Sequence, residues 1–252
     1  MVAKSVVITG SNRGIGLEFV KQLVASSEPP QYLFATCRNP ETATELQEVA
    51  KGASKTKLFI EKLDVTNESE IDALAEKVAS VVGSDGLNVL LNNAGYFDRN
   101  QSKLTELTSD GLVEHFKANT VAPILLTKAF LPLLKMGSAA NKSLPLSTKR
   151  ASVIHITTKV ASLSDNTSGG RWSYRISKAA LNMAAKNMGF ELEPDGILVL
   201  LLHPGWVRTD MGGPNGLIDA ETSVRGMLNF IATAGVNEAC TMYDYAGKKI
   251  EW

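Results

Sequence analysis

The sequence contains few of the residues that mark disulfide-linked or metal-binding proteins. Its 252 residues include two cysteines, Cys37 and Cys240, which lie far apart in the chain. A disulfide between them is possible but unsupported, and a reducing compartment such as the cytoplasm is the simpler expectation. The three histidines, His115, His155 and His203, lack the spacing of metal ligands. We therefore predict no metal site.

Charge and hydropathy give no sign of a nucleic-acid or membrane partner. The 26 basic and 26 acidic side chains cancel, so no strongly basic surface is indicated. No apolar run reaches the roughly 18 residues that cross a bilayer. The chain enters its first β-branched run at Ser5–Thr9 without the layout of a signal peptide. We expect a cytoplasmic protein with no nucleic-acid and no membrane partner.

Short β-branched or apolar runs alternate with longer helical patterns along the whole chain. Runs such as Ile197–Leu202 are apolar throughout, as in strands covered on both faces. The alternation predicts an α/β fold: a doubly wound parallel sheet of Rossmann type, with about seven strands and helices on both faces. No repeat or linker divides the chain, which indicates one domain over residues 1–252. The expected strands are Ser5–Thr9, Tyr32–Cys37, Lys57–Leu63, Asn88–Asn92, Ser152–Thr157, Gly196–His203 and a short one near Thr241–Tyr243, and the expected helices are Gly14–Ala25, Pro40–Ala50, Glu68–Val82, Thr108–Leu134, Ser173–Glu193 and Ala220–Ala234.

Two segments have the composition of surface excursions. Gly137–Arg150 is rich in Ser, Lys, Asn and Ala, and we expect it to be a flexible connection before the fifth strand. Asp210–Ile218 contains Gly212, Gly213 and Gly216 among other turn formers. Within residues 210–222 we expect a mobile substrate loop over a site.

The first strand leads into a glycine-rich turn, Thr9–Gly16, and then into a helix. Glycine lets the backbone approach a pyrophosphate closely, and the free N–H groups of a helix N-terminus favour an anion. The spacing is GxxxGxG rather than GxGxxG, and a turn of this kind alone could be a plain strand–helix connection. Its place after the first strand favours a dinucleotide site formed by Gly10, Ser11, Asn12, Arg13, Gly14, Ile15 and Gly16.

The end of the second strand indicates which dinucleotide is bound. NAD sites usually place a carboxylate there for the ribose hydroxyls, whereas this chain has Arg38 and no acidic residue. A guanidinium pairs well with phosphate. We therefore predict that Arg38, helped by Arg13, holds the 2′-phosphate of NADP(H); two solvated arginines are the alternative.

Tyr174 and Lys178 are four residues apart in a helical pattern, so they share one helix face. A phenol with a pKa near 10 is a poor acid–base at neutral pH. An ammonium about 4 Å away at an effective dielectric of ~20 supplies ~4 kcal/mol, enough to lower that pKa to ~7. The pair is a plausible proton donor for carbonyl reduction, although such spacing alone is more often a solvated helix face.

Six motifs follow one another through nearly the whole chain: Thr9–Gly16, Asp64 after the third strand, Asn92–Gly95 after the fourth, Asn119 in a long helix, Tyr174 with Lys178, and Pro204–Thr209 after the sixth strand. In this order they resemble the short-chain dehydrogenase/reductase family. At finer grain the chain is similar to the sniffer-type carbonyl reductases, through Gly86–Leu90, His203–Val207, Thr209–Gly213 and Trp252.

The resemblance implies a role for each matching position. Tyr174 would exchange the proton, Lys178 would lower its pKa and bind the nicotinamide ribose, and Asn119 would anchor a water molecule beside the lysine. The remaining positions would line the cofactor: Asp64 and Val65 at the adenine, Asn93, Ala94 and Gly95 at the adenosine ribose, and Pro204, Gly205, Val207 and Thr209 near the nicotinamide. Asp64 as a simple turn cap and Asn119 as an ordinary helix residue are the alternatives.

One position departs from the family pattern. A serine normally follows the fifth strand, but this chain has Thr157 and Thr158 there. The alignment puts Thr158 in the catalytic place, where its hydroxyl could still donate to a carbonyl. Successive strand residues face opposite sides, so both threonines cannot face the nicotinamide. Ser162 is a weaker candidate.

Two functions of different classes remain open from the sequence. The leading hypothesis is an NADP(H)-dependent reductase of a small carbonyl compound, such as a ketone, aldehyde or quinone. The alternative is a dinucleotide-binding sensor or scaffold with little turnover, suggested by Thr158 and by Gly137–Arg150 as a partner surface. The resemblance also implies a homodimer or homotetramer formed through the helices that contain Asn119 and Tyr174.

Overall fold

The computed structural model describes residues 3–252, and its centre is one eight-stranded sheet. The strand order is β3-β2-β1-β4-β5-β6-β7-β8, with every pair parallel except β7 and β8. The order reverses beside β1, as in a doubly wound sheet. The strands are β1 (Ser5–Ile8), β2 (Tyr32–Cys37), β3 (Lys57–Lys62), β4 (Val89–Asn92), β5 (Ser152–Ile156), β6 (Leu198–His203), β7 (Met242–Asp244) and β8 (Lys249–Ile250).

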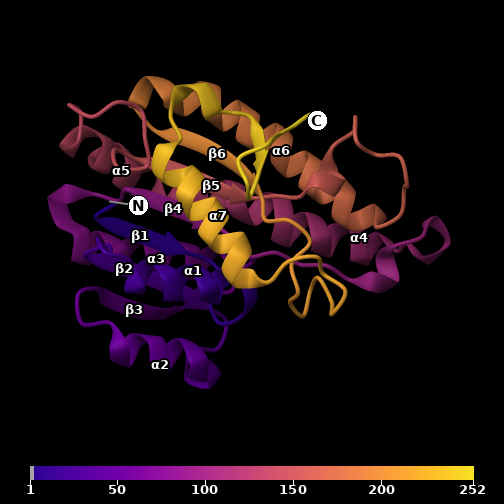
Figure 1. Ribbon diagram of the computed structural model, residues 1–252, viewed down its shortest axis with the longest axis horizontal. Coiled ribbons are helices and arrows are strands. Elements are labelled where there is room, and N and C mark those ends of the chain that lie inside the picture. Colours follow the sequence, from indigo (N-terminus) through magenta and orange to yellow (C-terminus); the bar gives the residue numbers. More distant parts are fainter. Residues whose placement is uncertain (1–2) are drawn as a thin grey trace.

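Helices cover both faces of this sheet, and each face has its own core (Figure 1). Alternate residues of one strand belong to different cores: Val6 and Ile8 pack beneath α1, α2 and α7, while Val7 packs beneath α3, α5 and α6. The fold prediction is confirmed. The helices are α1 (Gly14–Ala25), α2 (Thr44–Gly52), α3 (Glu68–Val82), α4 (Ser109–Phe116), α5 (Ala122–Ala140), α6 (Trp172–Leu192) and α7 (Ala220–Thr233).

The long helical region predicted at Thr108–Leu134 is longer and less regular than expected. A π-helical turn at Lys117–Val121 joins α4 to α5, and the combined helix of 32 residues is long and apolar enough to cross a bilayer. Half of its most apolar window is buried inside the fold, as in the core helix of a globular domain. Packing against the sheet accounts for its composition.

The expectation of a flexible segment from Gly137 was wrong at its start. α5 continues to Ala140. Gly137 packs so closely against the backbone of Leu87 that an added Cβ would lie 2.2 Å from the carbonyl oxygen of Leu87. Ser138 donates to the carbonyl oxygens of Asp195 and Gly196. The small and polar residues at the start of this segment therefore allow close packing of α5. Only the residues after 140 form the connection to β5.

Two smaller differences arise at element ends. The region Pro40–Thr42, expected to start a helix, is a separate 3-10 turn before α2. The eighth strand, Lys249–Ile250, was not anticipated. It is only two residues long and is defined by antiparallel pairing with β7, which a local pattern cannot indicate.

Candidate active site

The predicted site residues gather at the carboxyl edge of the sheet, where parallel strands place their following loops side by side. A cavity of about 770 Å³ opens there. Of the residues predicted from sequence, those that line it are Ile15, Thr158, Tyr174, Pro204, Gly205, Val207 and Thr209. The others lie behind or beside it, along the turns that follow β1, β2, β3 and β4 and on the helices that carry Asn119 and Lys178.

The glycine-rich turn after β1 is held by the turn after β4. Gly10 has a φ of 69° and Gly14 a φ of 54°, which favour residues without a Cβ. A Cβ on Gly16 would lie 2.1 Å from the carbonyl oxygen of Gly10. The amide of Asn93 donates to the carbonyl oxygens of Thr9 and Gly10 at 2.9 and 3.1 Å. The two turns therefore form one rigid unit at the N-terminus of α1.

Ser11 contributes to this turn from the inside. It is fully buried, and its hydroxyl donates to the carbonyl oxygen of Ile8 at 3.0 Å. Its backbone N–H donates to the carbonyl oxygen of Thr36 on the neighbouring strand. The hydroxyl of Ser11 is therefore used to shape the turn, whereas Asn12 and Arg13 are exposed.

The two arginines predicted for the 2′-phosphate have different surroundings. Arg38 is exposed at the end of β2 and forms no ion pair within residues 3–252. Arg13 pairs with Asp210 at 3.0 Å, with both side chains mostly exposed. Arg38 is thus the available guanidinium, and Arg13 would have to exchange its partner.

Asp64 caps the turn after β3, as the alternative reading of this residue anticipated. Its Oδ1 accepts from the backbone N–H and the hydroxyl of Thr66 at 2.9 and 2.7 Å. These hydrogen bonds, together with the nearby charge of Arg38, hold the pKa of the Asp64 carboxyl below its usual value. Its Oδ2 has no hydrogen bond within the described residues and is the atom left for a ligand.

Asn119 and Lys178 meet beneath Gly95. Asn119 lies in the π-helical turn, and its amide donates to the carbonyl oxygen of Tyr96 and to the hydroxyl of Ser177 at 2.8 and 3.0 Å. A Cβ on Gly95 would lie 3.4 Å from Asn119 Oδ1 and 3.7 Å from Lys178 Nζ. The missing side chain at Gly95 therefore leaves room for these two polar groups behind the cavity.

Lys178 is buried and donates from Nζ to the carbonyl oxygen of Ile156 at 2.9 Å. Burial lowers its pKa to about 8. An ammonium with a reduced pKa and one backbone acceptor retains two further donors for a ligand.

Tyr174 is half-buried in the cavity wall, and its ring lies beside that of Phe97 with centroids 5.1 Å apart. Removal of the phenol from water raises the pKa of Tyr174 to about 12, with the charge of Arg171 acting in the opposite direction. The lowered pKa predicted for Tyr174 beside Lys178 is not present in the chain without a cofactor. Burial is the main cause of the raised pKa of Tyr174, and Lys178 donates its hydrogen bond to the carbonyl oxygen of Ile156.

The hydroxyl groups after β5 have distinct environments. Thr157 donates to Oδ1 of Asn182 on α6 at 2.6 Å, so its hydroxyl is committed inside the fold. Thr158 Oγ1 accepts only a 3.4 Å hydrogen bond from the N–H of Val160, and within residues 3–252 it donates to no group. Ser162 is bonded to the backbone of Glu251. The geometry thus favours Thr158 as the hydroxyl available in the cavity.

The segment after β6, which includes the predicted substrate loop, forms one wall of the cavity. Leu217 N–H donates to the carbonyl oxygen of Trp206 at 2.7 Å, and Trp206 Nε1 donates to that of Gly212 at 2.8 Å. The loop is therefore cross-linked to the residues that follow β6. It ends at Asp219, which caps α7, so residues 220–222 of the predicted loop belong to the first helical turn.

Much of the cavity wall was not identified from the sequence. It includes Phe97 and Arg99 after the Asn92–Gly95 motif, Arg171 before α6, and His203 at the end of β6. Burial lowers the pKa of His203 to about 4, so it is neutral at physiological pH. These four lining residues are close in sequence to recognised motifs, and that closeness was the signal that could have identified them. Over the part of the chain that the structure describes, no group of three or more His, Cys, Asp or Glu is arranged to hold a metal.

Known proteins share this architecture. The chain matches the family model described as short chain dehydrogenase over residues 4–217. The carbonyl reductase Sniffer of D. melanogaster has a similar structure with a TM-score of 0.96 at 41% identity, covering 99% of this chain and 100% of that chain. An NADPH-bound carbonyl reductase from chicken fatty liver has a TM-score of 0.92 at 39% identity over 100% of both chains. The C-signal of Myxococcus xanthus is 38% identical over 174 residues, or 69% of this chain and 98% of that protein.

Proposed function

Because this chain belongs to the short-chain dehydrogenase family, as its motifs predicted, we propose that it is an NADP(H)-dependent reductase of small carbonyl compounds. One observation carries the proposal: the Tyr174 phenol and the Thr158 hydroxyl line one cavity, with Lys178 and Asn119 behind it. Two hydroxyl donors in one wall suit a carbonyl oxygen on which negative charge develops.

The chain offers a cradle that fits a phosphorylated dinucleotide. The turns around Gly10 and Gly16 leave no room for side chains, which lets a pyrophosphate approach the first N–H groups of α1. Arg38 is exposed beside them and suits the 2′-phosphate. Two structural relatives of this fold are described as NADPH- or NADP-bound. When bound, the nicotinamide supplies the hydride, and the protein supplies orientation and the proton.

Most of the other predicted residues would line the cofactor. Asp64 Oδ2 would accept from the adenine amine, with Val65 beside the ring. The turn formed by Asn93, Ala94 and Gly95 would line the adenosine ribose, and Pro204, Val207 and Thr209 the nicotinamide end.

Proton transfer to the carbonyl oxygen would depend on Tyr174 and Lys178. With its pKa near 12 in the chain alone, Tyr174 holds its proton at neutral pH and can donate it to the carbonyl oxygen. Lys178 would bind the ribose and stabilise the phenolate left behind.

Replacing Tyr174 with phenylalanine tests the proton donor. Tyr174→Phe keeps the ring against Phe97 and removes the hydroxyl, so we expect kcat to fall by about 10²–10⁴-fold with NADPH affinity nearly unchanged. NADPH oxidation against a panel of quinones, aldehydes and diketones measures turnover, and fluorescence titration measures binding. Near-normal turnover in this variant means that another group donates the proton.

Replacing Arg38 with alanine tests the choice of cofactor. We expect wild type to bind NADPH more tightly than NADH, and Arg38→Ala to lose at least about tenfold in NADPH affinity with little change for NADH, since a charge-assisted pair contributes about 1.5–3 kcal/mol. Lys62→Ala, which removes an exposed cation from the end of β3, serves as the matched control. An unchanged preference in Arg38→Ala would contradict the assignment.

A dinucleotide-binding sensor or scaffold is the second candidate. It is favoured by the relative whose printed name is C-signal rather than that of an enzyme. NADPH binding without oxidation by any member of the carbonyl panel would support it. Turnover that depends on Tyr174 would exclude it.

We also propose a homodimer or homotetramer formed through the α4–α5 and α6 helices. Val121 on the first and Ile176, Met183 and Phe190 on the second are large apolar side chains that are at least 40% exposed. Light scattering of wild type and of Met183→Lys tests this surface.

A cytoplasmic location is proposed because Cys37 and Cys240 are free thiols, and cell fractionation tests it.

A further inference from the structure

Two arginines at the cavity lack carboxylate partners. Arg99 donates from Nη2 to the carbonyl oxygen of Met211 at 3.4 Å, and neither it nor Arg171 forms an ion pair within residues 3–252. Both line the cavity together with Lys159, which by contrast is paired with Asp165 at 3.3 Å. The cavity therefore has two guanidinium groups whose charge is not neutralised by the protein.

The segments that carry these arginines face each other across the rim. Arg99 begins the 3-10 turn Arg99–Gln101, and Ser102 follows it. On the other side, a Cβ on Gly170 would lie 3.9 Å from the carbonyl oxygen of Ser102. Arg171 comes next in the chain, so the two guanidinium groups project from adjoining stretches of backbone.

The backbone at Arg171 is in a conformation that side chains with a Cβ rarely adopt. It has a φ of 49° and a ψ of 42°, in the left-handed region, and its side chain makes no capping hydrogen bond to α6. Gly169 and Gly170, with φ of 59° and 69°, adopt this region without strain, whereas an arginine does so at an energetic cost. Capping of the helix does not account for an arginine here, and strain of this kind is common where a side chain serves a ligand.

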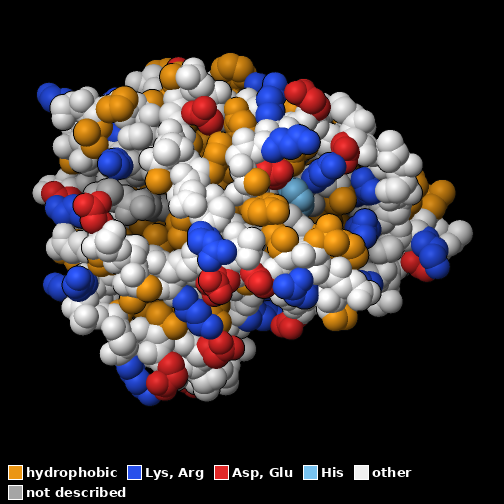
Figure 2. Space-filling model, viewed as in Figure 1, with side chains coloured by type: hydrophobic (Ala, Val, Ile, Leu, Met, Phe, Trp, Pro, Cys, Tyr) orange, Lys and Arg blue, Asp and Glu red, His pale blue; other side chains and the backbone are white. Residues whose placement is uncertain are grey.

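The rest of the wall is mainly apolar. Phe97, Val160, Trp206 and Leu217 line it, and Figure 2 shows apolar side chains beside a histidine, flanked by lysine and arginine side chains, on this face. The one acidic residue in the lining is Asp244, whose Oδ1 already accepts from the N–H groups of Ala246 and Lys248. An apolar chamber with two unpaired cations at its rim suits a ligand that has an apolar body and an anionic end.

We propose that the preferred carbonyl substrates carry an anionic group, such as a carboxylate, on an apolar body, and that Arg99 and Arg171 bind this group. This inference rests on the proposed reductase function. The apolar body would pack against Phe97 and Trp206 while the carbonyl oxygen lies at Tyr174. Arg171 precedes Tyr174 by three residues at the N-terminus of α6. This helix end therefore positions both the side chain that would bind the anion and the side chain that would donate the proton.

A matched pair of substrates tests the proposal: para-carboxybenzaldehyde and its neutral methyl ester. We compare the ratio of their kcat/KM values between wild type and the double variant Arg99→Gln with Arg171→Asn, so that differences in intrinsic reactivity cancel. Asparagine tolerates the left-handed backbone, so this variant removes charge without adding strain. Loss of the Arg171 charge also acts on the proton donor Tyr174, but it does so for both substrates and cancels in the ratio. We expect the ratio of acid to ester to fall by at least about tenfold, through KM for the acid.

Two further variants separate a specific site from general electrostatics. Lys103→Gln removes one positive charge from the nearby exposed 3-10 turn that contains Glu106, away from the cavity lining, and should leave the ratio unchanged. Lysine at both arginine positions should restore part of the preference for the acid. A loss in Lys103→Gln of about half that of the double variant on a logarithmic scale, or more, would overturn the site, because it would mean that net charge alone sets the preference.

The outcomes distinguish this inference from the proposed function. If wild type reduces the ester and the double variant keeps the same ratio, the anion site is wrong and the reductase remains. If NADPH binds but neither aldehyde nor any member of the carbonyl panel is reduced, the proposed function fails and the substrate class fails with it.

Discussion

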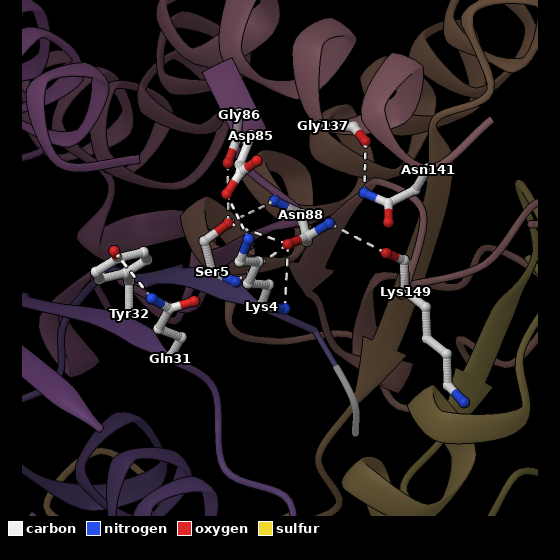
Figure 3. Close-up of polar contacts among 10 residues, drawn as sticks. All are labelled: Lys4, Ser5, Gln31, Tyr32, Asp85, Gly86, Asn88, Gly137, Asn141 and Lys149. Atoms are coloured by element: carbon white, nitrogen blue, oxygen red, sulfur yellow. Dashed lines mark hydrogen bonds and ion pairs between the residues drawn. The ribbon is translucent and has the colours of Figure 1, made fainter. Parts of the chain in front are cut away.

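An asparagine lies at each end of β4, and the two side chains differ in how many hydrogen bonds they form. Asn88, just before the strand, has its whole carboxamide hydrogen-bonded. Its Oδ1 accepts from the N–H groups of Lys4 and Ser5, and its Nδ2 donates to the carbonyl oxygen of Lys149 (Figure 3). The Nδ2 also donates to the carbonyl oxygen of Arg150. Asn92, at the strand's other end, has a single contact. Its Nδ2 lies 3.4 Å from Nδ1 of His155, and its buried Oδ1 has no partner in the described chain.

Other polar groups show the same difference in hydrogen bonding between the two ends of β4. Within residues 3–252, the buried His155 Nε2 on the neighbouring strand and His203 Nδ1 at the end of β6 also lack hydrogen-bond partners, and burial lowers the pKa of His155 to about 3. Polar groups at the amino end of β4 join the first strand to the loop before β5, whereas those at the carboxyl end surround the place where a ligand is expected. Unpaired buried polar atoms cost stability, and they are commonly retained where they serve function.

The largest effect on stability is expected at Asn88. Asn88→Ala leaves two backbone N–H groups and two carbonyl oxygens without their partners, so we expect the free energy of unfolding to fall by about 3 kcal/mol or more. Urea denaturation measures it. Asn141→Ala, which removes one partly exposed bond to Gly137 in the same region, should cost under about 1 kcal/mol. Similar losses in both variants would remove the special role of Asn88.

A pH-dependent effect of intermediate size is expected at Lys178. Its folded pKa, about 8, lies below the ordinary 10.5, so between these pH values the unfolded chain binds more protons and stability rises with pH. Lys178→Met removes this dependence. The pKa difference corresponds to about 3 kcal/mol, and loss of the hydrogen bond to Ile156 offsets about 1 kcal/mol of it. We therefore expect the variant to gain on the order of 2 kcal/mol relative to wild type at pH 7, and the gain to shrink towards pH 10.5. A constant difference across this range would contradict a buried, titrating lysine.

The smallest effect is expected at Asn92. Asn92→Ala removes an unpartnered oxygen and one long contact, so the free energy of unfolding should change by less than about 1 kcal/mol. The comparison with Asn88→Ala is direct, because each variant removes one carboxamide, at opposite ends of β4. A loss as large as that of Asn88→Ala would mean that the two ends are not energetically distinct.

Local sequence patterns predicted the regular elements well. The bounds of β2, α1 and α3 were predicted without error, because a run of β-branched residues or an amphipathic period ends there at clear turn formers. Asp210–Ile218 was recognised from its glycines, yet what holds the loop in place, the Trp206 contacts to Leu217 and Gly212, links residues that no pattern relates. The raised pKa of Tyr174 was also not predicted, because it depends on burial of the phenol by segments distant in the sequence.

The order of the chemical motifs, the strand–helix alternation and the absence of a carboxylate after β2 were already determined by the sequence, because each depends on residues close together in the chain. Only the tertiary structure decided which of Thr157 and Thr158 keeps its hydroxyl available, that Arg13 pairs with Asp210, and that Arg99 and Arg171 line one cavity. These outcomes depend on hydrogen-bond partners and charges brought from remote parts of the chain, and their free energies exist only once the sheet and its loops have assembled.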